Sequence, residues 1–125
     1  MTFTISKRFH FSASHVLEGI GPDHPCARLH GHNWTVTLFL AGDIDERGFV
    51  VDFIDLVPFS RLIDDEFDHR HLNDLLDVSP TSENLARHLH DRARERGPQV
   101  VACAVSETPS TCAVYAPGAV VVLPG

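Results

Sequence analysis

The chain has 125 residues, a formal net charge of −7 and a single lysine, Lys7. This length suits one domain with one core, so we expect residues 1–125 to form a single domain. The negative charge excludes a basic groove for nucleic acid, and no stretch is long and apolar enough to span a bilayer. The N-terminus lacks the apolar block of a signal peptide, and three cysteines, an odd number, suit a reducing compartment. We therefore expect a soluble, cytoplasmic protein that binds neither nucleic acid nor membranes.

The first half of the chain predicts three strands. From residue 2 to 14, apolar side chains occupy alternate positions, which is the period of a half-buried strand. A second strand is predicted over 30–41, where alternate residues from His30 to Leu40 share one face. The turn-forming stretch AGDIDERG then precedes a short strand predicted over 49–51.

Two helices and two further strands follow. Asp52 and Asp55 resemble an N-cap pair that opens a helix toward Phe67, and Pro58 requires that helix to start later or to bend. This order of elements predicts an α+β fold in which an antiparallel sheet carries its helices on one face. The remaining elements are a helix over 81–96, with Leu85, Leu89 and Ala93 facing inward, and strands over 99–107 and 111–115.

Histidine pairs of the form His-x-His occur three times, against about 0.6 expected from composition, so the pair alone is weak evidence. His88 and His90 fall in the predicted second helix, where two residues turn the side chain by about 200°, so they cannot share a metal ion. His30 and His32 fall on one face of a strand, about 6.5 to 7 Å apart, and can converge on one ion. From spacing alone, two hydrogen-bonded strand histidines remain an open alternative.

His15 offers a third imidazole, because it ends the first predicted strand where a neighbouring strand carries it alongside His30 and His32. Three imidazoles with an open fourth position are typical of catalytic zinc, whereas structural zinc is usually closed by four protein ligands. Cys26 can be that fourth ligand. It can instead stand beside the metal as a base, since a nearby dication lowers the pKa of a thiol. The residue types leave both roles open.

Two carboxylates stand out from their surroundings. Asp68 adjoins His69, and a carboxylate beside an imidazole can fix its tautomer and raise its basicity, although a polar loop explains the same residues. Glu107 ends an otherwise apolar strand, so it either binds something or lies at the rim of the sheet. By contrast, Cys103 and Cys112 have apolar strand neighbours and are expected to be packing residues.

Five motifs in order, FSASH, CARLHGH, FDHRHLND, SPTSEN and SET, resemble those of the 6-pyruvoyl-tetrahydropterin synthase family, which includes 6-carboxy-tetrahydropterin synthases. The resemblance covers about residues 3–116. His71 falls where the family varies, so it is not expected to be catalytic. The resemblance implies His15, His30 and His32 as ligands of Zn²⁺, Cys26 as the catalytic base, Asp68 and His69 as its relay partners, and Glu107, Thr81 and Ser82 as residues that hold the pterin ring.

The same resemblance implies a fold and an assembly. The fold is the tunnelling fold, a four-stranded antiparallel sheet with two helices on one face. Its subunits join edge to edge into a barrel, as a homotrimer or hexamer with active sites between subunits, which removes the open edges of the sheet.

The resemblance also implies an activity. The three residues between Cys26 and His30 resemble the carboxy branch of the family. That branch converts 7,8-dihydroneopterin triphosphate to 6-carboxy-5,6,7,8-tetrahydropterin, acetaldehyde and triphosphate, on the route to 7-deazaguanine compounds such as queuosine. The alternatives are a pyruvoyl-type synthase, which eliminates triphosphate without cleaving the carbon chain, and a non-catalytic module that binds zinc and pterin.

Three positions depart from the family pattern. Val16, Ser106 and Ala116 stand where the family often has basic residues, so the triphosphate has fewer cations to meet it. The candidates to replace those cations are Lys7, Arg8 and Arg28.

Overall fold

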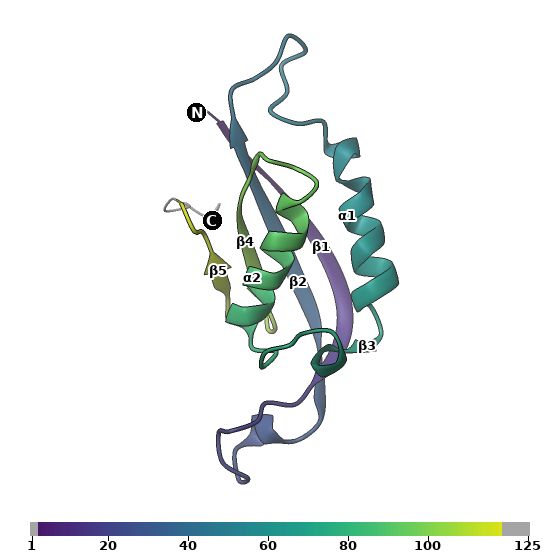
Figure 1. Cartoon of the computed structure of the whole chain (residues 1–125), viewed down its shortest axis with the longest axis vertical. Coiled ribbons are helices and arrows are strands. Elements are labelled where there is room, and N and C mark those ends of the chain that lie inside the picture. Colours follow the sequence, from purple (N-terminus) through teal and green to yellow (C-terminus); the bar gives the residue numbers. More distant parts are fainter. Residues whose placement is uncertain (1–2, 119–125) are drawn as a thin grey trace.

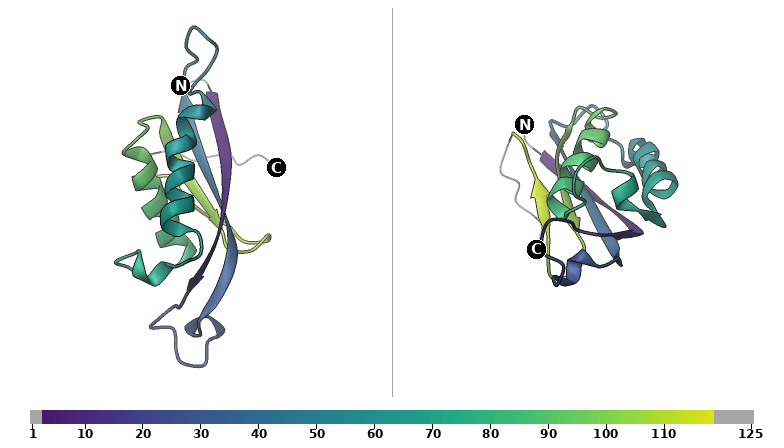
Figure 2. Two further views of the ribbon diagram at one scale, coloured as in Figure 1. Left: turned by 90° about the vertical axis from the view of Figure 1, so that its right-hand side faces the viewer. Right: turned by 60° about the horizontal axis from the view of Figure 1, so that its bottom comes forward.

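The computed structural model describes residues 3–118 and has an α+β fold built on one sheet, with the strand order β3-β1-β2-β4-β5. Both helices lie on the same face of this sheet (Figures 1 and 2). None of the helices in the described residues is long and apolar enough to cross a membrane. The strands are β1 (Phe3–His15), β2 (His30–Gly42), β3 (Arg70–His71), β4 (Val100–Ser106) and β5 (Ala113–Tyr115), and the helices are α1 (Val57–Leu62) and α2 (Ser82–Arg94).

The long antiparallel pair β1 and β2 forms the centre of the sheet, as the alternating pattern predicts. Its register sets His15 opposite His30 and Ala13 opposite His32. Because side chains alternate between faces, all three histidines lie on the face that also carries the buried Trp34. The Trp34 Nε1–H donates to the Ala13 carbonyl at 3.2 Å, which satisfies the one polar group of this core side chain.

The prediction of a four-stranded, purely antiparallel sheet is wrong in one respect. The two-residue strand β3 adds a fifth strand, and it pairs parallel to β1, with Ala13 opposite Arg70 and Ser14 opposite His71. A strand this short has no periodic signal in the sequence, because its pairing depends on the connection that returns from α1. The sheet is therefore mixed.

The strand predicted over 49–51 is not formed. Asp45 organises a turn there instead: its N–H donates to the Phe49 carbonyl at 2.8 Å, and its carboxylate accepts from the Phe49 N–H at 3.1 Å. Gly48 takes a positive φ of 91° within this turn. The N–H and C=O groups of Phe49 are both bonded within the turn, so neither is left to pair with a neighbouring strand.

Helix α1 starts late, as Pro58 requires. The Asp52 carboxylate accepts from the Ile54 N–H at 3.1 Å and opens a 3-10 turn, Phe53–Leu56, before the helix. Pro58 then lies in the first turn of α1, where its missing N–H costs no hydrogen bond. The helical path ends in a wider π turn, Ile63–Phe67.

Helix α2 agrees with its predicted pattern. The Thr81 hydroxyl accepts from the Asn84 N–H at 3.1 Å and caps the first turn. Its buried side includes the three predicted positions, Leu85, Leu89 and Ala93.

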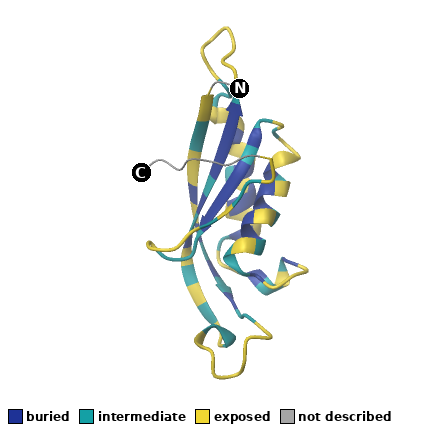
Figure 3. Ribbon diagram, turned by 90° about the vertical axis from the view of Figure 1, so that its left-hand side faces the viewer, coloured by how far each residue is buried: buried dark blue, intermediate teal, exposed yellow. Residues whose placement is uncertain are grey.

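Four chain segments meet at one end of the elongated molecule, namely the end of β1, the start of β2, the end of β4 and the start of α2 (Figure 1). Figure 3 shows exposed loops at both ends of the molecule and buried strands between them. Two of the predicted site residues, His15 and His30, flank the β1–β2 loop, residues 16–29, at this end.

Candidate metal centre and active site

His15, His30 and His32 form one compact cluster. Each offers a ligand atom, and these three atoms all lie within 4.8 Å of one another. The ring centroid of His15 lies 4.4 Å from the ring centroid of His30 and 5.2 Å from that of His32. In the described residues no cysteine or carboxylate belongs to this group. The strand register therefore produces a site of three imidazoles that can hold one metal ion.

Backbone carbonyls fix two of these rings. The Nδ1 of His15 lies 2.8 Å from the Pro80 carbonyl oxygen, and the Nδ1 of His30 lies 2.7 Å from that of Arg28. Because a carbonyl can only accept, each Nδ1 carries the proton and each Nε2 is left with a free lone pair. Both rings are thus set in the tautomer that a metal ion needs.

The Nε2 of His15 gives a direct test of whether a metal fits. This atom is buried and has no hydrogen-bond partner. Burial lowers the pKa of His15, and the neighbouring His30 and His32 lower it further, against the opposing effects of the Pro80 carbonyl and of Glu107. A buried nitrogen without a partner is costly, and an ion in the space it faces would satisfy it. The donor set of three imidazoles fits zinc.

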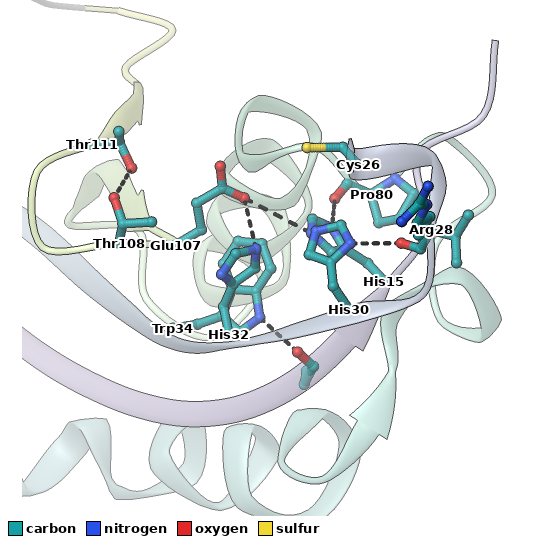
Figure 4. A network of polar contacts seen from close by, with 12 residues as sticks. His15, Cys26, Arg28, His30, His32, Trp34, Pro80, Glu107, Thr108 and Thr111 are labelled. Carbon is teal, nitrogen blue, oxygen red and sulfur yellow. Dashed lines mark hydrogen bonds and ion pairs between the residues drawn. The ribbon is translucent and has the colours of Figure 1, made fainter. Parts of the chain in front are cut away.

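Glu107 lies beside this cluster. It follows β4, and its Oε2 is 3.5 Å from the Nε2 of His32 and 3.9 Å from the Nε2 of His15 (Figure 4). Its side chain is partly exposed. The carboxylate therefore stands just past the end of β4 and faces two of the three imidazoles, and its binding role stays a prediction.

Cys26 is held in the β1–β2 loop by backbone bonds. Its carbonyl accepts from the Leu17 N–H at 2.9 Å, and its N–H donates to the Nδ1 of His24 at 3.1 Å. These contacts place it in a short 3-10 turn, Pro25–Ala27, and leave it partly exposed. Figure 4 shows the thiol at the end of the molecule that carries the triad and Glu107.

Asp68 and His69 form a separate pair on the other side of β1. The Asp68 Oδ2 lies 2.8 Å from the Nδ1 of His69, and its Oδ1 accepts from the Ser12 N–H at 2.9 Å. The Ser12 hydrogen bond, followed by that with His69, lowers the pKa of Asp68. His69 has a positive φ of 59°, and its ring is 82% exposed. Within the described chain the pair has no hydrogen bond or ion pair with the triad, Cys26 or Glu107.

The remaining predicted residues have varied surroundings. The Thr81 hydroxyl is engaged in capping α2, and Ser82 is the first residue of that helix. Arg28 is exposed and contributes its carbonyl to His30. Lys7 and Arg8 precede His15 by eight and seven residues on β1, so at about 3.3 Å per residue they lie more than 20 Å away. Within one chain they cannot meet a phosphate bound near the triad.

The other predicted histidine pair and the two remaining cysteines lie outside the triad. His88 and His90 lie on α2 and diverge as predicted, the first against Phe67 and the second against Tyr115. Cys103 is buried in β4, and burial raises the pKa of its thiol. The expectation that Cys112 packs in a strand is wrong, since it is exposed and precedes β5.

Sequence reasoning missed the groups that hold the metal ligands in place. The carbonyls of Pro80 and Arg28 carry no side-chain signal, because any residue offers the same acceptor. Asn73 does carry a signal, since it belongs to the FDHRHLND motif, and its amide bonds the backbone of Val16.

Comparisons with known proteins bear on the family of this chain. Residues 4–118 match the sequence profile described as "6-pyruvoyl tetrahydropterin synthase". The 6-carboxy-5,6,7,8-tetrahydropterin synthase of Bacillus subtilis is 36% identical over 132 residues, covering 93% of this chain and 86% of that protein. The dihydroneopterin monophosphate aldolase of Pyrococcus furiosus is 33% identical over 98 residues, covering 78% and 81%.

Solved structures show the same fold. The 6-pyruvoyl tetrahydropterin synthase of Caenorhabditis elegans superposes with a TM-score of 0.83 at 25% identity, covering 93% of this chain and 96% of that one. The ordered motifs, the three-imidazole cluster and these relatives lead to one conclusion: the chain is a member of the 6-pyruvoyl tetrahydropterin synthase family of enzymes.

Proposed function

We propose that this chain is a zinc-dependent 6-carboxy-5,6,7,8-tetrahydropterin synthase, a carbon–carbon lyase that converts 7,8-dihydroneopterin triphosphate and releases acetaldehyde and triphosphate. The observation that carries the proposal is the three-imidazole cluster with its unsatisfied His15 Nε2, next to Glu107. The Bacillus subtilis relative supports the choice of product. In this role the chain serves 7-deazaguanine biosynthesis, the route to queuosine.

Each residue then has a chemical task. His15, His30 and His32 would hold the zinc ion, which when bound would supply the Lewis-acid chemistry that makes the C–H beside the substrate hydroxyls more acidic. Cys26 removes that proton as a general base, and the Asp68–His69 pair returns one. The base role of Cys26 is supported by its absence from the group of mutually close metal-ligand atoms in the described residues.

Glu107 has the chemistry to hold the pterin. A carboxylate can accept two parallel hydrogen bonds from the ring N–H and amino group of a pterin. The helix N-terminus at Thr81 and Ser82 adds backbone donors and hydroxyls to the same end of the molecule. Arg28 is the one proposed phosphate contact on the β1–β2 loop.

The proposed active form is a homo-oligomer, a trimer or hexamer closed into a barrel. The sheet ends in two very short strands, β3 and β5, and in the described residues β1 pairs with β3 at only two positions, which leaves most of that edge open. The Asp68–His69 pair lies on this edge and has no contact with the triad of its own chain. A neighbouring subunit is therefore proposed to supply the pair that completes each site.

Product identification tests the activity. Zinc-loaded protein is incubated without oxygen with 7,8-dihydroneopterin triphosphate, and the pterin products and trapped aldehyde are identified by mass spectrometry. We expect 6-carboxy-5,6,7,8-tetrahydropterin together with acetaldehyde. A pyruvoyl product without acetaldehyde would assign the chain to the other branch, and no conversion by the zinc-loaded oligomer would favour a pterin-binding module.

One observation favours a second candidate, a lyase acting on the monophosphate. Val16, Ser106 and Ala116 offer no positive charge, while Glu107 places a negative one beside the triad. The Pyrococcus furiosus relative is described as a dihydroneopterin monophosphate aldolase. The same assay run with 7,8-dihydroneopterin monophosphate decides between the two, since kcat/KM for the triphosphate must be the higher under the leading proposal.

A further inference from the structure

Asn73 forms two hydrogen bonds with the backbone of Val16, the residue that follows His15. The Asn73 Oδ1 accepts from the Val16 N–H at 2.9 Å, and the Asn73 Nδ2 donates to the Val16 carbonyl at 2.9 Å. The partners are 57 residues apart in sequence and partly buried. One side-chain amide thus satisfies both backbone groups of a residue, as a neighbouring strand would.

Val16 needs such a partner because of its place in the chain. The pairing of β1 with β2 ends at the His15–His30 pair, and the exposed loop 16–29 begins there. Pairing of β1 with β3 ends one residue earlier, at Ser14 and His71. Among the described residues, the other backbone hydrogen bond at the start of this loop runs from the Leu17 N–H to the carbonyl of Cys26, which is itself part of the loop.

Other contacts from the same segment hold His15 from its remaining sides. The Ser14 hydroxyl lies 2.9 Å from the Nδ1 of His71, and the His15 ring bonds the Pro80 carbonyl through its Nδ1. Residues 71–80 therefore contact three consecutive positions, residues 14–16, where β1 ends. Asn73 is the member of this set that fixes the chain after His15.

We propose that Asn73 is a positioning residue of the metal centre, which holds the backbone at Val16 so that the His15 Nε2 stays within the triad. The inference rests on the proposed function, because it takes the triad to be a metal site. Asn73 touches neither substrate nor metal in this role and acts through the main chain. Groups that orient metal ligands in this indirect way typically change metal affinity by about 10- to 100-fold.

Three substitutions separate the contributions of the amide. Asn73→Leu keeps similar bulk and removes both bonds, so zinc dissociation measured against a competing chelator should become about 10- to 100-fold weaker. Asn73→Asp keeps an acceptor for the Val16 N–H and loses the donor, so we expect an intermediate loss. Asn84→Ala is the matched control, because its side chain also bonds a backbone carbonyl, that of Ser79, but does not contact β1.

A spectroscopic readout separates positioning from general destabilisation. The visible absorption of bound Co²⁺ depends on ligand geometry, so at saturating Co²⁺ the spectrum of Asn73→Leu should differ from that of the wild-type protein. A variant that is only less stable would regain the wild-type spectrum once saturated. Circular dichroism checks folding, and if Asn73→Leu does not fold, the same two measurements on Asn73→Asp decide the question.

Each outcome has a distinct meaning. Weaker binding and an altered spectrum in the Asn73 variants, with both unchanged in Asn84→Ala, support the positioning role. Wild-type affinity and spectrum in the folded Asn73 variant overturn it and leave the proposed function intact. A wild-type protein that takes up no Co²⁺ at the triad overturns the metal site, and the positioning role falls with it.

Discussion

Two of the three imidazoles of the triad are oriented by backbone carbonyls. The Pro80 and Arg28 carbonyls accept hydrogen bonds from the Nδ1–H groups of His15 and His30, so little reorganisation of these two rings remains when an ion binds. A hydrogen-bonded pair of strand histidines, the simpler interpretation of the sequence, does not explain why the His15 Nε2 is buried without a partner. That one atom gives the metal site its physical basis.

Cys26 offers the clearest test of the proposed chemistry. In Cys26→Ala the three imidazoles are untouched, so zinc content and oligomeric state should stay as in the wild-type protein. Turnover should fall by about 10² to 10⁴, the usual contribution of a positioned acid or base. Zinc stoichiometry, sedimentation and steady-state kinetics measure the three quantities, and unchanged turnover would rule out the role of Cys26 as base.

Glu107 can be tested without the triphosphate. Glu107→Gln replaces a carboxylate oxygen with a donor, which cannot accept a hydrogen bond from the pterin edge. Binding of 7,8-dihydroneopterin followed by fluorescence should weaken by about tenfold or more, since a hydrogen bond to a charged group contributes about 1.5 to 3 kcal/mol. Zinc content is the control, because the carboxylate also lies 3.5 Å from His32. An unaltered affinity would place the pterin pocket elsewhere.

The residues of the site differ in how far the sequence predicts them. His30 and His32 follow from strand alternation, and His15 follows because the two strands that carry the ligands are antiparallel neighbours. The carbonyl of Pro80 could not be found in this way, since it reaches His15 across 65 residues through a connection without a regular pattern. Local periodicity predicts side chains on one face, but not the long-range contacts that orient them.

At the scale of single elements, the structure departs from the predicted pattern in the shortest segments, β3 and residues 49–51. The long strands β1 and β2 and the helix α2 follow from periods of two and 3.6 residues, which many positions reinforce. The two residues of β3 form a strand only because the Asp68–His69 corner bonds Ser12 of β1. The stretch 49–51 fails to form one because Asp45 engages the backbone of Phe49 first.

Helix α2 carries a titratable contact that makes stability depend on pH. His88 packs against Phe67, and desolvation, followed by the charge of Arg92, lowers its pKa below 6.5, against the opposing charges of Asp91, Asp77 and Glu66. Between the folded-state pKa and 6.5 the unfolded chain binds the extra proton, so stability falls as the pH drops through this window.

His88→Gln should therefore lose less stability than the wild-type protein between pH 7 and pH 5. Urea unfolding in the presence of a chelator measures this difference free of metal binding. His10→Gln, which removes an exposed imidazole on β1, is the control. Equal pH dependence in wild-type and His88→Gln proteins would contradict the assignment of this contact.

At the scale of the whole molecule, one chain keeps the two groups of proposed site residues apart. The triad and Glu107 lie at the end of β1 and β2, while the Asp68–His69 pair lies on the edge of the sheet beside Ser12. Asp68 and His69 bond the main chain of Ser12 at the edge of β1 that faces away from β2, whereas His30 and His32 lie on β2, so β1 lies between the two groups. Assembly of several subunits is the proposed means of joining them.

Mixing two inactive variants tests this assembly. Cys26→Ala and His69→Ala should each be inactive alone, and mixed oligomers formed by dissociation and reassociation should regain activity. If each site uses two subunits, random mixing in equal amounts restores about one quarter of the sites. Activity that stays absent in verified mixed oligomers would show that both groups act within one chain.

At the centre of the proposed function is a zinc ion held by three imidazoles and no thiolate, so that Cys26 is free to move a proton. X-ray absorption of the zinc-loaded protein measures the ligand shell directly. We expect one zinc per chain, surrounded only by nitrogen and oxygen at about 2.0 to 2.1 Å, with His15→Ala losing the stoichiometric metal. A sulfur shell near 2.3 Å, roughly the Zn–thiolate distance, would contradict this by making Cys26 a ligand.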